Sequence, residues 1–288
     1  MASVKSGYVV VDGIRTHYLE GGVGPTVAFM HSGEFGGCAE LSWEFNIEAF
    51  ADHFRVVAPD WLGFGRTDKV FDFAAGRARS LDHMRRFFEV MDITEADFVG
   101  NSMGGSNLAR IAAQRPVIFP IRSLVLASGG GYAPDSEARR KLLRYDGSDA
   151  SMREMLDGLF FDKEKWVYNA AYRARRQEFA HLPGAWECTA AARFKAPFAE
   201  QKGQFGQADA TPYENIAVPT LLVAGAEDQL RLPGYAHEVG AKIPDSEVIV
   251  YDNAAHCPHI ERAEEFNAAA IAFLKKVHEK KGIAAAAA

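Results

Sequence analysis

The sequence predicts an α/β protein with a mostly parallel sheet, helices on both faces and a helical insertion in its second half. Short apolar runs such as 26–30 and 220–225 alternate with amphipathic stretches such as 80–91, as in parallel sheets with helical crossovers. Between 132 and 212 the strand-like runs stop, and the sequence becomes charged and rich in aromatic residues. The 288 residues suffice for one large domain with such an insertion.

The individual elements follow from apolar periodicity and turn residues. The first two strands flank Asp12-Gly13, a strong hairpin signal between β-rich runs. The expected strands are 8–11, 14–20, 26–30, 54–60, a run ending at Val99, 123–128, 220–224 and 247–251. Helices with one apolar face are expected over 43–53 (through Phe45, Ile47, Phe50 and Ala51), 80–91, 106–113 and 263–277.

These elements divide the chain into a core interrupted by an insertion. We expect the first part of the core over 1–131, an inserted helical subdomain over 132–212, and the second part of the core over 213–283. The alanine run at 284–288 is expected to be a disordered tail.

Composition narrows the function class. The net charge is −6 without a Lys/Arg-rich stripe, which argues against nucleic-acid binding. No apolar run reaches the roughly 18 residues that span a bilayer, and the N-terminus lacks a signal-peptide core, so we expect no membrane association. The three cysteines, Cys38, Cys188 and Cys257, form no C-x-x-C pair, which favours a reduced, cytoplasmic setting.

The most informative motif is Gly100-Asn101-Ser102-Met103-Gly104, between a strand-like run and a helix-like run. It matches the G-x-S-x-G nucleophile elbow, in which a sharp strand-to-helix turn exposes the serine and requires small neighbours. The alternative is an ordinary serine in a glycine-rich turn. The context favours Ser102 as a nucleophile.

Two further residues complete a catalytic constellation. A nucleophilic serine needs a histidine base, which in turn needs a carboxylate to fix its tautomer. Asp228 follows the strand 220–224 and His256 follows the strand 247–251, giving the chain order Ser, Asp, His. Glu227 is an alternative to Asp228, and His259 is an alternative to His256, although His259 is better explained as a polar residue opening the next helix.

An oxyanion hole is expected from backbone N–H groups. We assign one to Met103, which follows the serine, and the other to Gly33, in the glycine-rich loop 31–37. An ordinary glycine turn is the alternative for Gly33. His31 is expected to be a structural hydrogen-bonding residue of that loop.

Several segments resemble the α/β-hydrolase superfamily and, within it, the meta-cleavage product hydrolases. The elbow at 100–105 resembles the family's G-N-S-[ML]-G-G, and residues 53–68 resemble its H-F-x-V-x-A-x-D-x-x-G-[YF]-G-x-[ST]-D. Further similar segments are 31–36, which resembles H-G-G-G-P-G, 189–193 in the insertion, and His256 with Glu261 and 265–267.

The resemblance implies an eight-stranded α/β-hydrolase fold, with the insertion forming a cap over the sheet. It also implies hydrolysis of a carbon–carbon bond in a vinylogous 1,5-diketone, a 2-hydroxy-6-oxo-dienoate formed by meta-cleavage of an aromatic ring. Ser102 would attack the substrate or activate the attacking water. His256 would act as base and then acid, and could drive ketonisation of the dienol before cleavage, while Asp228 would orient it.

Four residues are assigned to substrate binding from the same resemblance. Arg193 would bind the substrate carboxylate, since guanidinium is a fixed cationic fork. Asn101 would bind an oxo or hydroxyl group. Ser32 and Cys257 are assigned to the same site, where the family usually has glycine and tryptophan. For Arg193 and Asn101 the alternatives are a surface arginine of the cap and a tight-turn residue.

Departures from the family pattern keep further functions open. Besides Ser32 and Cys257, Glu34 replaces a glycine and would place a carboxylate near an anionic substrate, Phe35 replaces a proline, and Ser42 stands where an asparagine is usual. These changes would also fit a carboxylesterase or lactonase. A non-catalytic ligand receptor or scaffold stays open as well, and so does a cofactor-free oxygenase or perhydrolase.

The sequence implies no cofactor and no metal. It lacks a G-K-[ST] phosphate loop and a G-x-G-x-x-G before a helix, and it shows neither an H-x-x-x-H helix nor a carboxylate cluster. The expected partner is a small-molecule substrate. The resemblance also implies a homodimer.

Overall fold

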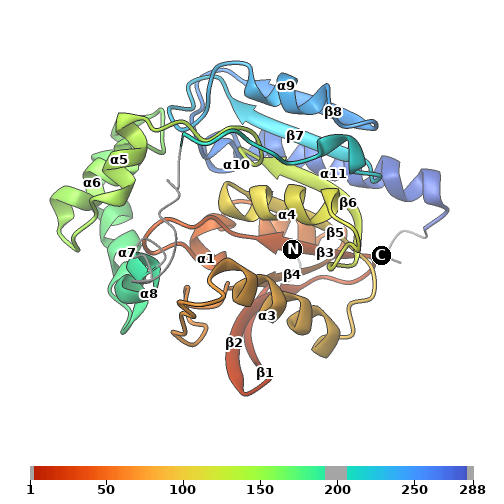
Figure 1. Cartoon of the computed structure of the whole chain (residues 1–288), viewed down its shortest axis with the longest axis horizontal. Helices are drawn as coiled ribbons and strands as arrows, with labels where there is room; N and C mark the ends of the chain where they lie inside the picture. The colour runs from red at the N-terminus through yellow and green to blue at the C-terminus, as the bar shows by residue number, and fades with distance from the viewer. Residues whose placement is uncertain (1–2, 192–205, 284–288) are drawn as a thin grey trace.

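A single eight-stranded sheet forms the centre of the computed structural model, which describes residues 3–191 and 206–283 (Figure 1). The strand order is β1-β2-β4-β3-β5-β6-β7-β8. β2 pairs antiparallel with β1 and β4, and all later neighbours pair in parallel. The predicted mostly parallel, eight-stranded α/β fold is therefore confirmed.

The strands lie where the apolar runs predict them. They are β1 (Lys5–Val11), β2 (Ile14–Gly21), β3 (Thr26–Met30), β4 (Arg55–Pro59), β5 (Ala96–Asn101), β6 (Ile121–Ala127), β7 (Thr220–Gly225) and β8 (Ser246–Tyr251). β3, β5, β6 and β7 are buried almost throughout, which is why their sequences are continuously apolar rather than alternating.

Helices cover both faces of the sheet. One apolar core packs the sheet against α3 (Arg77–Val90), α4 (Met103–Ala113) and α9 (Tyr235–Gly240). The other packs it against α1 (Ala39–Ser42), α2 (Ile47–Ala51) and α11 (Ala263–Lys281). The short helix α10 (Pro258–Glu261) precedes α11. The sequence did not predict α9, which has only six residues.

The continuous helix expected over 43–53 is wrong. The chain forms α1 and α2 with a turn between them, and Phe45 is 43% exposed rather than part of an apolar stripe. The Asn46 side chain explains the break, because it donates hydrogen bonds to the carbonyl of His259 and to Asn267. These contacts hold Asn46 in the turn between the two helices.

The insertion is helical in its described part. It contains α5 (Glu137–Leu143), α6 (Asp149–Asp157), a π-helical turn (Lys163–Val167), α7 (Ala170–Ala180) and α8 (Ala185–Ala191). A 3₁₀ turn (Tyr213–Asn215) precedes β7. Figure 1 shows α5–α8 grouped on one side of the molecule, apart from the helices that cover the sheet. We refer to them as the cap.

The cap has a core of its own that reaches the main domain. Its cluster of buried side chains includes Met155, Phe160 and Trp166 from the cap, and Phe35 and Cys257 from loops of the main domain. The cap is therefore packed directly on the loops that follow β3 and β8. The predicted tail at 284–288 lies outside the described residues. No helix in the described part of the chain is long and apolar enough to cross a membrane.

Candidate active site

The turn between β5 and α4 holds Ser102 in a conformation that few side chains adopt. Its backbone has φ 51° and ψ −109°, immediately before the first residue of α4. A Cβ added to Gly104 would lie 2.1 Å from the Met30 carbonyl oxygen, and one added to Gly100 would lie 2.6 Å from Leu108 Cδ1. The small residues around Ser102 are thus required by close backbone approach, as the elbow pattern predicts.

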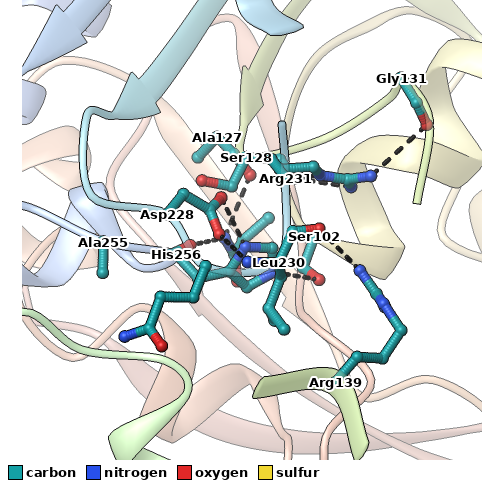
Figure 2. A network of polar contacts seen from close by, with 12 residues as sticks. Ser102, Ala127, Ser128, Gly131, Arg139, Asp228, Leu230, Arg231, Ala255 and His256 are labelled. Carbon is teal, nitrogen blue, oxygen red and sulfur yellow. Dashed lines mark hydrogen bonds and ion pairs between the residues drawn. The ribbon is translucent and has the colours of Figure 1, made fainter. Parts of the chain in front are cut away.

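The structure brings together the three residues that the sequence singled out. His256 Nε2 lies 2.7 Å from Ser102 Oγ, and His256 Nδ1 lies 2.8 Å from Asp228 Oδ2 (Figure 2). The carboxylate can only accept, so Nδ1 donates to it and Nε2 accepts the serine proton. The side chains of Asp228 and His256 are each 2% exposed. This geometry fits general-base activation of Ser102.

Asp228 is held as a carboxylate in spite of its burial. Burial raises its pKa, but the neighbouring His256 and Arg231 and the Leu230 N–H outweigh that effect, so the pKa lies below its usual value. The Leu230 N–H donates to Asp228 Oδ1 at 2.8 Å. The alternative carboxylate, Glu227, is used elsewhere: it accepts the Ala254 N–H at 3.0 Å.

Sequence reasoning missed Arg231, a buried cation beside Asp228. Its guanidinium donates to the Ser128 carbonyl at 2.9 Å and also reaches the Gly131 carbonyl (Figure 2). It further donates to Ser106 Oγ at 3.2 Å and reaches the Tyr132 carbonyl. It thus ties the loop after β6 to the loop that carries Asp228. The one sequence signal for this role is that Arg231 follows Asp228 by three residues.

The two amides assigned to an oxyanion hole lie on adjacent segments. A Cβ added to Gly33 would lie 2.6 Å from Met103 Sδ, so the loop after β3 rests on the elbow. Met103 begins α4, and its N–H therefore has no acceptor within the helix. The positive end of the helix dipole at this point favours negative charge.

His31 is fixed as a structural residue of the same loop. The Trp61 N–H donates to His31 Nε2 at 2.9 Å, so the proton is on Nδ1, which donates to the Ser32 carbonyl at 2.6 Å. Burial lowers the pKa of His31. Both ring nitrogens serve the loop, as expected.

The second candidate base, His259, lies within α10, and it is His256 rather than His259 that contacts Ser102 Oγ. His259 is fully buried, and burial lowers its pKa to about 3. Its ring packs against Trp43 at 4.8 Å between centroids. This position matches the expected residue at the start of a helix.

The four residues assigned to substrate binding do not share one environment. Asn101 Nδ2 donates to the carbonyls of Ala127 (3.1 Å) and His256 (3.3 Å), and its buried Oδ1 has no partner within the described chain. Ser32 Oγ lies 3.4 Å from Ser42 Oγ. Cys257 is buried under the cap, and burial raises the pKa of its thiol. Arg193 lies outside the described residues.

Glu34, an unusual residue for the resembled family, has a partner in the cap. Arg176 of α7 donates to Glu34 Oε1 at 2.9 Å, and the two side chains are 1% and 5% exposed. The Arg176 guanidinium also donates to the Tyr172 hydroxyl at 2.7 Å. The carboxylate next to Gly33 is therefore neutralised by the cap, a pairing that the sequence did not reveal.

Comparison with known proteins now identifies the family. Residues 21–269 match the alpha/beta hydrolase family. The chain belongs to this family. It is 30% identical over 263 residues to the 2-hydroxymuconate semialdehyde hydrolase of Pseudomonas sp. (strain CF600), covering 90% of this chain and 89% of that protein.

A second relative and a solved structure that are similar to this alpha/beta hydrolase are also named as hydrolases. It is 29% identical to the 2-hydroxy-6-oxo-6-(2'-aminophenyl)hexa-2,4-dienoic acid hydrolase of Metapseudomonas resinovorans, over 93% of this chain and 90% of that one. A meta-cleavage product hydrolase from Pseudomonas fluorescens IP01, solved as a serine-to-alanine mutant with acetates, superposes with a TM-score of 0.83. It is 26% identical and covers 94% of this chain and 97% of its own. The resemblance to meta-cleavage product hydrolases is thereby confirmed.

Proposed function

We propose that this alpha/beta hydrolase cleaves a carbon–carbon bond in a 2-hydroxy-6-oxo-dienoate, a vinylogous 1,5-diketone from meta-cleavage of an aromatic ring. The observation that carries the proposal is the hydrogen-bonded chain from Ser102 through His256 to Asp228. The relatives' names supply the substrate class, because one is a 2-hydroxymuconate semialdehyde hydrolase (30% identical) and another hydrolyses a 2-hydroxy-6-oxo-hexa-2,4-dienoic acid (29% identical).

The first part of the proposed mechanism activates Ser102. His256 Nε2 accepts the serine proton as Oγ attacks the oxo carbonyl, and the Asp228 carboxylate stabilises the imidazolium. The low pKa of Asp228 suits this role, because the carboxylate stays ionised. Activation of water by Ser102 and His256 would use the same hydrogen bonds.

The second part stabilises the tetrahedral oxyanion. The Met103 N–H at the start of α4 and the Gly33 N–H on the adjoining loop are proposed to donate to it. The Arg176 guanidinium supports this arrangement, because it neutralises Glu34 immediately beside Gly33. An unpaired carboxylate there would oppose the negative charge of the transition state.

Carbon–carbon cleavage needs a stabilised carbon leaving group. Proton transfer from the dienol oxygen to the substrate carbon next to the oxo carbonyl would first give a ketone. After Ser102 Oγ has attacked the oxo carbonyl, the bond between these two carbons breaks, and its electron pair passes to the ketone, so that the leaving group departs as a dienolate and an acyl group remains on Ser102. Hydrolysis of the acyl group adds one water and yields a carboxylic acid and a smaller dienol. His256 is the proposed proton carrier in these steps.

The remaining substrate contacts stay predictions. Asn101 Oδ1 is buried and could accept a hydrogen bond from the substrate hydroxyl, while its Nδ2 is occupied by two carbonyls. Ser32 and Cys257 are proposed to line the same site; Cys257 packs in the apolar cluster shared with the cap, which supports its part of the proposal. Arg193 is proposed to bind the substrate carboxylate. A small-molecule substrate without a cofactor, and a homodimer, complete the proposal.

A panel of ring-fission dienoates, assayed beside simple aryl esters, tests the proposal. We expect loss of the yellow dienolate colour at a kcat/KM well above that for the esters, and no turnover by Ser102→Ala. Turnover of esters with no action on any dienoate would show an esterase instead.

A cap variant tests the substrate class separately. Arg193→Ala should impair dienoate turnover and leave aryl-ester turnover intact, whereas Arg175→Ala, at an exposed cap arginine paired with Glu44, should change neither. If Arg193→Ala leaves both activities intact, the carbon–carbon proposal fails.

A further inference from the structure

The backbone of His256 is anchored to the cap as well as to the sheet. Its N–H donates to the Leu159 carbonyl, just after α6, at 3.0 Å. Its carbonyl accepts a hydrogen bond from Asn101 Nδ2 at 3.3 Å. The position of the imidazole therefore depends on where the cap segment 159–162 lies.

Glu261 joins that cap segment to the same loop. Its Oε1 accepts the N–H groups of Phe161 (2.7 Å) and Asp162 (3.0 Å). Its Oε2 accepts the N–H of Ala255, the residue before His256, at 2.7 Å. One carboxylate at the end of α10 thus serves three backbone donors on two segments that are far apart in the chain.

Both side-chain positions that Glu261 fills with its oxygens must accept hydrogen bonds. The backbone N–H groups of Phe161, Asp162 and Ala255 can only donate hydrogen bonds, so each needs an acceptor. A carboxylate satisfies both sides, whereas an amide would present its NH₂ to a backbone N–H on one of them. Burial has the largest effect on Glu261 and raises its pKa, while the three N–H bonds and, to a smaller extent, the nearby Lys163 favour the ionised form.

We infer that Glu261 is a positioning residue for catalysis: it holds the His256 loop on the cap so that Nδ1 meets Asp228 and Nε2 meets Ser102. It reaches neither the substrate nor the reacting atoms through any of these three bonds. The inference rests on the proposed function only for its kinetic consequence. The hydrogen bonding of His256 can be measured without substrate.

The test compares Glu261→Gln and Glu261→Ala with Glu264→Gln, a matched change at an exposed residue of the first turn of α11. The first readout is the downfield proton resonance of His256 Nδ1–H, identified by its loss in His256→Gln. We expect it to be lost or broadened in both Glu261 variants and kept in Glu264→Gln. A purely structural contribution would lower the melting temperature and leave this resonance in place.

The second readout is the steady-state kinetics, with kcat and KM measured separately. We expect kcat to fall on the order of 10²-fold in Glu261→Ala, with a smaller fall in Glu261→Gln and an unchanged KM, because misplacement of a catalytic group acts on the chemical step.

Folded Glu261 variants with the wild-type resonance and wild-type kcat would overturn the inference. If Glu261→Ala does not fold, the isosteric Glu261→Gln decides by the same criteria. Failure of the wild type to cleave any dienoate would count against the proposed reaction alone, because the Nδ1–H resonance reports on His256 independently.

Discussion

The buried pair of Glu34 and Arg176 gives the sharpest prediction about stability. The guanidinium and carboxylate are 2.9 Å apart at 1% and 5% exposure, so neither can be rehydrated if its partner is removed. Breaking a buried pair in this way costs about 3–5 kcal/mol. At roughly 2 °C per kcal/mol, Arg176→Met should lower the melting temperature by about 6–10 °C.

A double-mutant cycle separates the pair from the individual side chains. Arg176→Met with Glu34→Gln removes both charges, so we expect the double variant to be more stable than the sum of the two single losses by about 0.5–3 kcal/mol. Lys141 and Asp157, about a third exposed at 2.6 Å within the cap, provide the control cycle. Their coupling should be no more than about 1 kcal/mol.

Denaturant unfolding of the four proteins in each cycle supplies these values. Strictly additive losses for Glu34 and Arg176 would refute the reasoning, because they would mean that the two charges do not compensate each other. A loss below about 1 kcal/mol for Arg176→Met would refute it as well, since it would place the carboxylate in water.

Three further predictions concern the site and the far end of the sheet. Asp228→Asn should lower kcat by about 10⁴-fold with little change in melting temperature, because an amide favours the wrong tautomer of the histidine; an unchanged kcat would contradict this role. Gly104→Ala should cost about 1–3 kcal/mol in denaturant unfolding, since its Cβ would lie 2.1 Å from a β3 carbonyl oxygen; wild-type stability would contradict that close approach. Burial raises the pKa of Asp97, but hydrogen bonds from His278 and Arg122 outweigh it and lower the pKa. This carboxylate therefore stabilises the fold above its unfolded pKa of about 4 and loses that effect as the pH falls further. Asp97→Asn should accordingly lower the melting temperature most at neutral pH, and a gap that widens in acid would contradict the sign.

Local patterns predicted most of the fold and the central residues of the site. The apolar runs of buried parallel strands are continuous, so their positions could be predicted within a few residues. The elbow was predictable because its glycines are needed for steric reasons within the turn itself: a Cβ at Gly104 or Gly100 would collide with backbone or side-chain atoms nearby. Asp228 and His256 followed because each comes directly after a parallel strand.

Contacts between distant segments could not be predicted in this way. Glu34 meets Arg176 across 142 positions, and Glu261 meets Phe161 across 100, so no spacing rule links them. The helix expected over 43–53 failed for the same reason, because its break depends on bonds from Asn46 to residues near the end of the chain. The sequence predicted the three residues of the proposed triad but not the contacts that hold them in place.

The central claim is that Ser102 is the nucleophile, activated by His256. A fluorophosphonate probe followed by mass spectrometry of the peptides tests it most directly. The account predicts one adduct per chain, on Ser102, absent in Ser102→Ala and strongly slowed in His256→Gln. A folded wild-type protein that remains unlabelled, or that carries the adduct on another serine, would contradict the account.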